Sequence, residues 1–247
     1  NYDIALVLGL GLGFWAAARN RLMSPAWVLL FVAAGFFSAW SGGRGQLLAL
    51  LVSGVLILLA VPQARRTPPV WMAILAFGIG ALLAHQAGQA ELMAAQLGKS
   101  IHSDSDQVSS GRVGLWMASL RRAAASPESL LFGYAPDAFS RHGIVSALPT
   151  VQGIQFAQPH NVIIQWLLDF GIIGCLLMLA WHGRVARSAL RILRNARVLD
   201  APVAAAALML GLFVYGLTDG LFYHLIPLTF IVILCAYLSA VAPRPPG

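Results

Sequence analysis

Charged residues are scarce in this chain, and acidic residues are the scarcest of them. Only 10% of the 247 residues are charged, with 9 acidic against 16 basic side chains, whereas 59% are hydrophobic and the mean hydropathy is +0.77. This lack of charge excludes an ordinary soluble domain, in which about 25% of residues are charged. It predicts an all-α polytopic membrane protein.

Cysteine is nearly absent, and so are repeats and low-complexity tails. The two cysteines, Cys175 and Cys235, both lie inside apolar segments, which excludes a framework of disulfides. The net charge of +7 suggests nucleic acid as a partner, but the arginines lie in short segments between apolar runs. In a membrane protein this pattern indicates orientation, so we expect no nucleic-acid partner.

Seven apolar runs approach the length of about 20 residues that a membrane-spanning helix needs. They cover residues 2–18, 25–41, 46–62, 69–88, 160–181, 201–219 and 224–242. We therefore divide the chain, as a single domain, into four spans (1–88), one large loop with short amphipathic helices (89–158) and three spans (159–247). The chain begins at Asn1 without a basic leader, so we expect it to be part of a longer membrane protein.

Arginine placement predicts how these spans are oriented. If the spans alternate across the bilayer, one side collects ten arginines and a single acid, Asp200. The arginines are Arg19, Arg21, Arg65, Arg66, Arg184, Arg187, Arg191, Arg194, Arg197 and Arg244. Cytoplasmic loops carry an excess of Lys and Arg, so this side is predicted to be cytoplasmic and the loop 89–158 to be external.

Arg44 is the exception, because it lies in a turn on the predicted outer face. The turn reads SGGRG (residues 41–45), and a helix is expected to start immediately after it. An interfacial arginine that reaches lipid head groups is one explanation. The other is a phosphate or pyrophosphate site, because glycines let backbone N–H groups approach an anion and a helix N-terminus adds positive charge.

The fifth run opens with polar residues, QPHNVIIQWLLDFGIIG (residues 158–174). Pro159 suits a first helical turn, and in one straight helix Gly171 and Gly174 would share a face with His160. Small residues on that face would let a neighbouring helix pack closely. Asp169 would point about 180° away from His160 at 100° per residue, so we expect it to be structural. His160 itself fits an interfacial residue, a metal ligand or a general base.

The spacing of His160, Asn161, Gly171 and Gly174 resembles the H-[NSQ]-x9-G-x-x-G pattern of bacterial O-antigen ligases and of the related polymerases and protein O-oligosaccharyltransferases. Two loop segments, GRVGLW (111–116) and LFGYAPDAF (131–139), resemble the outer-loop signature of the same family. Arg44 also resembles an arginine at the outer end of an earlier family helix. The likeness covers residues 25–240, although family members usually have ten or more spans.

This resemblance implies an enzyme that transfers a glycan from an undecaprenyl pyrophosphate carrier to an acceptor hydroxyl, on lipid A–core or another glycan, at the periplasmic face of the bacterial inner membrane. It implies His160 as the base that accepts the proton of the acceptor hydroxyl, and Arg44 and Arg112 as clamps for the pyrophosphate. Asn161 would orient His160 or a sugar hydroxyl. No cofactor or metal is implied, and the spans contain no tight cluster of metal ligands.

Other functions stay open at this point. A polymerase or a protein oligosaccharyltransferase would share the same motif. A transporter of the same carrier predicts charges in several spans, whereas Asp169 is nearly the only deep one. An intramembrane serine protease needs Gly-x-Ser-Gly at a helix start, and the nearest segment, LVSG (51–54), lacks the first glycine.

Overall fold

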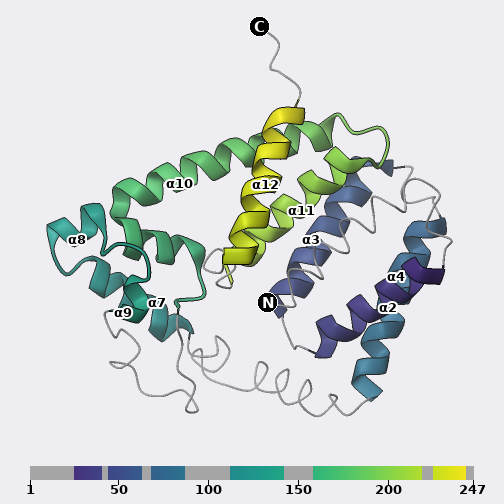
Figure 1. Cartoon of the computed structure of the whole chain (residues 1–247), viewed down its shortest axis with the longest axis horizontal. Helices are drawn as coiled ribbons and strands as arrows, with labels where there is room; N and C mark the ends of the chain where they lie inside the picture. The colour runs from purple at the N-terminus through teal and green to yellow at the C-terminus, as the bar shows by residue number, and fades with distance from the viewer. Residues whose placement is uncertain are drawn as a thin grey trace, which may run out of the picture. The chain divides into compact units, whose positions relative to one another are not determined.

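The computed structural model describes residues 25–40, 44–62, 68–86, 112–141, 158–218 and 225–242. Every regular element in these ranges is a helix (Figure 1), which confirms the all-α prediction for the described part of the chain. The helices are α2 (Pro25–Trp40), α3 (Arg44–Ala60), α4 (Pro68–Ala84), α7 (Arg112–Ala123), α8 (Pro127–Phe132), α9 (Ala138–Arg141), α10 (Val162–Arg194), α11 (Ala201–Gly216) and α12 (Leu225–Val241).

Five of the predicted spans coincide with helices to within a few residues: α2, α3, α4, α11 and α12. The predicted span 2–18 lies outside the described residues. Among those described, one helix, α10, is long and apolar enough to cross a membrane, and the other apolar helices have 10–17 residues. The number of spans and the side on which the loop 89–158 lies therefore stay predictions.

The chain divides into two compact units. The first comprises Asn1–Met93, Arg184–Tyr215 and Thr229–Gly247, and the second comprises Ala94–Gly183 and Gly216–Leu228. Helices α10, α11 and α12 each contribute residues to both units.

In the first unit, α2 and α4 pack backbone against backbone at two glycines. A Cβ atom on Gly35 would lie 1.9 Å from the carbonyl oxygen of Phe77, and one on Gly80 would lie 1.9 Å from that of Val32. Small residues permit such close approach between helices, as is common in membrane proteins. The buried side chains beside these glycines are Phe31, Ala34, Ala73 and Ala76.

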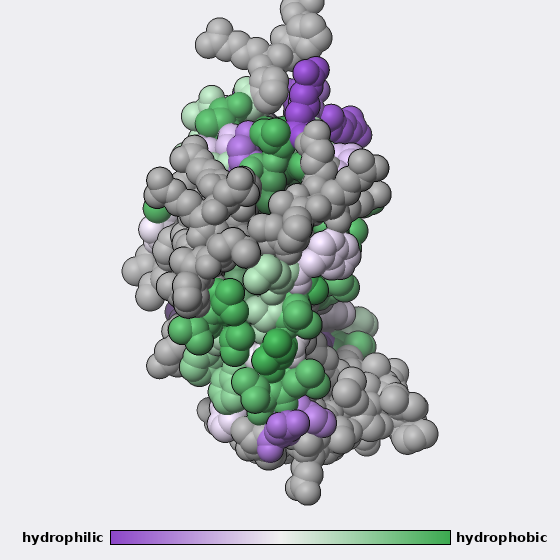
Figure 2. Space-filling view, turned by 90° about the vertical axis from the view of Figure 1, so that its right-hand side faces the viewer, coloured by the Kyte–Doolittle hydropathy of each residue, from purple (hydrophilic) through white to green (hydrophobic). Residues whose placement is uncertain are grey.

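The outer surface of α2 and α4 is strongly apolar. Figure 2 shows hydrophobic residues gathered on this face. The large exposed side chains of the two helices are Leu29, Leu30, Phe37, Trp40, Trp71, Met72, Ile74, Leu75, Ile79, Leu82 and Leu83. An apolar surface of this kind is typical of contact with lipid or with other apolar helices rather than with water.

In the second unit, α7, α8 and α9 pack against the beginning of α10. Their shared core consists of Leu115 and Ala123 from α7, Ala138 and Phe139 from α9, and Leu168 from α10, each at most 2% exposed. The amphipathic helix within the large loop is thus present, with its two arginines, Arg121 and Arg122, on the exposed side.

Helix α10 is not the straight helix that the sequence suggested. It runs on from the predicted end at residue 181 to Arg194, and its backbone leaves helical geometry at Gly171. A straight helix would separate Trp166 from His182 by about 24 Å at 1.5 Å per residue, yet their ring centroids lie 4.6 Å apart. The first arm (162–170) therefore folds back beside residues 172–183 of the second arm (172–194), as Figure 1 shows.

Candidate active site around His160

The bend between the two arms of α10 depends on Gly171. Its φ of 65° and ψ of −170° lie in a region that is essentially restricted to glycine. A Cβ atom at this position would lie 2.3 Å from the carbonyl carbon and oxygen of Leu131. Gly171 is thus required for the bend itself and for the close approach of the segment that ends α8.

Gly133, at the C-terminal end of α8, is the partner of Gly171 at this contact. Its φ is 74°, and a Cβ atom on it would lie 2.5 Å from the backbone nitrogen of Gly171. The glycines of the two segments that resemble family signatures, LFGYAPDAF and H-N-x9-G-x-x-G, therefore meet directly. The expectation that Gly171 and Gly174 share one helical face with His160 is wrong, because α10 leaves helical geometry at Gly171.

Backbone donors from the loop satisfy the carbonyl groups that the bend leaves without helical partners. In a continuous helix the carbonyls of Leu168 and Asp169 would accept from residues four positions ahead. Instead they accept from the N–H groups of Tyr134 and Ala135, at 2.9 and 2.8 Å. The bend and the loop after α8 thus stabilise each other, because an unpaired buried carbonyl would cost free energy.

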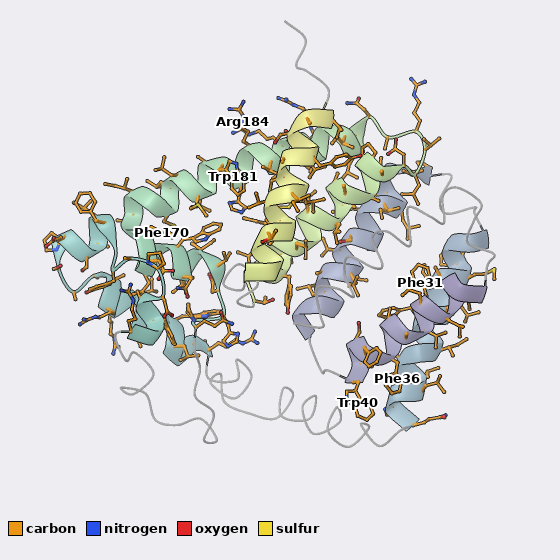
Figure 3. All side chains as sticks on the ribbon, viewed as in Figure 1. Phe31, Phe36, Trp40, Phe170, Trp181 and Arg184 are labelled. Atoms are coloured by element: carbon orange, nitrogen blue, oxygen red, sulfur yellow. The ribbon has the colours of Figure 1, made fainter. Side chains whose placement is uncertain are left out.

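Gly174 also serves the bend. A Cβ atom on Gly174 would lie 2.3 Å from the Cβ atom of Phe170, the last residue of the first arm. Figure 3 labels Phe170 near the bend, with Trp181 and Arg184 farther along the second arm. The lack of a side chain at Gly174 therefore makes room for Phe170 where the chain reverses.

His160 lies just before α10 rather than in its first turn. The helix begins at Val162, and His160 has a φ of 52°, in the left-handed region that few non-glycine residues adopt. Such a conformation costs about 1–3 kcal/mol and persists only when the surroundings impose it. Strained backbone of this kind gathers at functional sites, and His160 is half-buried.

Asn161 holds the end of the helix that follows His160. Its side-chain oxygen accepts from the N–H groups of Ile163 and Ile164, at 3.0 and 3.2 Å, which makes it the N-cap of α10. Its Nδ2 donates to the carbonyl oxygen of Leu217 at 3.1 Å, in the turn after α11. One side chain thus fixes both the helix start and its distance from that turn.

Arg112 reaches the same turn from α7. Its Nη1 donates to the carbonyl oxygen of Thr218, the residue after Leu217. Consecutive Cα atoms are 3.8 Å apart, so the guanidinium of Arg112 and the amide of Asn161 meet neighbouring peptide groups. The structure therefore brings together two of the residues that the sequence assigned to one site.

Trp116 ties α7 to the residue before His160. Its indole Nε1 donates to the carbonyl oxygen of Pro159 at 2.7 Å. Arg112 and Trp116 are four residues apart, so they lie on one face of α7. His160 is thus held from both sides, by Trp116 through Pro159 and by the Asn161 cap.

Arg112 brings a positive charge to the candidate site. Arg112 is half-buried, and no carboxylate pairs with it in the described part of the chain. A guanidinium fork of this kind matches phosphate oxygens in pairs. Arg112 is therefore the candidate phosphate-binding residue of this site.

Arg44, the second predicted clamp, is the first residue of α3 in the first unit. Its side chain and the glycines before it lie outside the described residues. Within the described ranges, no three His, Cys, Asp or Glu side chains form a group that could hold a metal ion.

Two residues of the second unit have contacts that the sequence did not reveal. Trp116 and Gly133 both lie in the loop segments that resemble family signatures, but nothing in the spacing indicates that they contact Pro159 and Gly171. Asp169 has a structural role, as expected: its carboxylate accepts from Nε2 of Gln165 at 2.6 Å and from the backbone N–H group of Ala138 in the loop.

A protein-family model described as O-antigen ligase matches residues 29–179, which is more than half of the chain. The match extends from α2 through the loop helices to the second arm of α10, and so includes Arg112, His160, Asn161 and both glycines of the bend. Comparison of the chain with curated proteins and with solved structures gave no match.

Proposed function

This chain belongs to the O-antigen ligase family, and from that premise we propose that it transfers a glycan from an undecaprenyl pyrophosphate carrier to a hydroxyl of lipid A–core. Members of the family are integral membrane proteins that act as glycosyltransferase-like ligases or polymerases on lipid-linked glycans. In our proposal the reaction takes place at the periplasmic face of the inner membrane.

His160 is the general base of the proposed reaction. The acceptor hydroxyl attacks the anomeric carbon of the glycan, its proton passes to the imidazole, and the bond from that carbon to the pyrophosphate oxygen breaks. A positioned base of this kind contributes about 10²–10⁴-fold to the rate. The observation that carries the proposal is the left-handed His160, fixed by Trp116 through Pro159 on one side and by the Asn161 cap on the other.

Arg112 binds the leaving pyrophosphate, which departs with the electron pair of the broken bond. Charge grows on the bridging oxygen as the bond breaks, so a fixed cation lowers the barrier more than it strengthens substrate binding. The support for this role is the half-buried guanidinium held on the same turn as Asn161. We propose Arg44 as a second contact for the pyrophosphate, on the strength of its glycine turn and helix start alone.

A lipopolysaccharide gel tests this proposal in cells. A strain that lacks the parent gene is complemented with wild type, His160→Ala or His85→Ala, and protein levels are compared. His85 is an exposed histidine at the end of α4, so its replacement is the matched control. We expect wild type and His85→Ala to restore long O-antigen chains and His160→Ala to leave lipid A–core bare.

The same gel separates the branches of the family. Core without any O-antigen, with polymer still on its carrier, identifies a ligase, whereas core that bears one repeat unit identifies a polymerase. A normal ladder from His160→Ala would refute the proposed role of His160. A normal lipopolysaccharide pattern in the deletion strain itself would refute the lipid A–core acceptor.

A further inference from the structure

Asp169 connects the first arm of α10, which follows His160, to the loop that carries Arg112. Its side chain is 5% exposed, at the end of the first arm of α10. Its Oδ1 accepts from the N–H group of Ala138 at 3.1 Å, and its Oδ2 accepts from Nε2 of Gln165 at 2.6 Å. Its own carbonyl oxygen accepts from Ala135, so one residue makes three hydrogen bonds around the bend.

The contact with Ala138 leads directly to α7. Ala138 is the first residue of α9, and it is fully buried in the core that also contains Leu115 and Ala123 of α7. The C-terminal end of α7 is held in turn by the hydroxyl of Ser129, which donates to the carbonyl oxygen of Ala123 at 3.0 Å. A displacement of α9 from the first arm would therefore move α7.

Movement of α7 would alter the candidate site, because α7 carries both Arg112 and Trp116. Arg112 meets the turn after α11, and Trp116 meets the residue before His160. The first arm begins after the Asn161 cap, and Asp169 lies near its other end. The arm and α7 are thus connected near His160 through Trp116 and Pro159, and at the other end through Asp169.

We propose that Asp169 is a positioning residue for glycan transfer: its hydrogen bonds to Ala138 and Gln165 hold α7, and with it Arg112, in register with His160. This inference rests on the proposed function. Asp169 itself touches no reacting atom. Its role is to fix the separation between the base and the cation that receives the leaving group, and an error of about 1 Å in such a separation can cost 10²-fold in rate.

The same geometry indicates which substitution preserves this role. In Asp169→Asn the amide oxygen can still accept from Ala138, and once the Gln165 amide flips, its Oε1 can accept from the new Nδ2. That oxygen is buried, and no partner for it is present among the described residues. Asp169→Ala removes both side-chain bonds. Comparison of the two variants therefore separates the effect of losing the hydrogen bonds from the effect of losing the carboxylate charge.

The experiment uses the purified full-length protein with an undecaprenyl pyrophosphate-linked glycan and core lipid, with rates normalised to folded protein from size-exclusion chromatography. For Asp169→Ala we expect kcat to fall by about 10–100-fold with KM for the donor changed by less than about threefold, since the binding groups themselves are retained. Asp169→Asn should restore most of the wild-type kcat. Amide hydrogen exchange of the peptide that contains Ala138 should be faster in Asp169→Ala alone.

These outcomes distinguish failure of this inference from failure of the proposed function. If wild type transfers glycan and Asp169→Ala is equally fast per folded molecule, Asp169 is not a positioning residue. If hydrogen exchange at Ala138 is unchanged in Asp169→Ala, the connection to α9 is wrong. If the wild-type protein transfers no glycan at all, the proposed function fails, and the positioning role fails with it.

Discussion

Replacement of Gly171 by alanine tests the bend in α10 most severely. The backbone at φ 65° and ψ −170° costs about 1–3 kcal/mol for a residue with a side chain. The added Cβ atom would also lie 2.3 Å from the carbonyl group of Leu131 and 2.4 Å from the backbone nitrogen of Phe132. Because these are backbone atoms, the chain must move, and overpacking of this kind costs about 1–3 kcal/mol more.

The two costs together amount to about 4 kcal/mol, which for a chain of this size corresponds to a fall in Tm of about 10 °C. Thermal unfolding in detergent, followed by size-exclusion chromatography, measures this change. Gly183→Ala is the matched control, because Gly183 lies in the second arm of the same helix and no atom lies within 4 Å of the position of its Cβ. Alanine is the better helix former, so this control should be stabilised by up to about 1 kcal/mol.

The transfer activity of Gly171→Ala should fall as well, since the loop that carries Arg112 rests on the bend. A Tm for Gly171→Ala within about 2 °C of the Tm of Gly183→Ala would show that the chain does not reverse at Gly171. The support that the bend gives to the loop carrying Arg112 would then be wrong as well.

Three further contacts are tested by substitution, each by thermal unfolding and by the rate of glycan transfer. Asn161→Ala should lower the free energy of unfolding by about 1 kcal/mol, because the helix cap is lost. Asn161→Asp should keep the cap and lose only the amide donor, so an equal loss of stability in the two variants would contradict the role of Asn161 as a cap. Trp116→Phe should cost about 1 kcal/mol for the lost indole hydrogen bond and slow transfer, and an unchanged rate would show that this bond does not hold His160. Gly80→Ala should destabilise by about 1–3 kcal/mol through overpacking, whereas Gly78→Ala, with open space at its Cβ, should not; similar values for the two would argue against the close contact of α2 with α4.

The sequence predicted most of the helices and proposed the candidate site residues, but it did not predict the path of the chain between them. Apolar runs determine where helices form, so α2, α4 and α12 appear close to the predicted positions. The fold-back of α10 was missed because a run of apolar residues with two glycines has the same composition whether it is straight or bent. What decides the outcome is the loop segment 134–135, whose N–H groups donate to the carbonyls at the bend.

Residues that act through contacts distant in sequence were also beyond prediction. The motif identified His160 and Asn161, yet the partner of Asn161 is a backbone carbonyl at Leu217, and backbone carbonyls carry no sequence signal. Similarly, Asp169 appeared only as a polar residue in an apolar run. Its partner at Ala138 is a backbone N–H group in the large loop, whose position relative to the helix no periodicity reveals.

The central claim is that His160 accepts the proton of the acceptor hydroxyl, and one rate tests it most directly. The initial rate of glycan transfer is measured for the purified full-length protein, with undecaprenyl pyrophosphate-linked glycan and core lipid, for wild type, His160→Ala and the exposed control His85→Ala. We expect His85→Ala to match wild type and His160→Ala to be slower by at least about 100-fold, with equal amounts of folded protein. A His160→Ala rate within about twofold of wild type would contradict the claim, because removal of a general base costs far more than that.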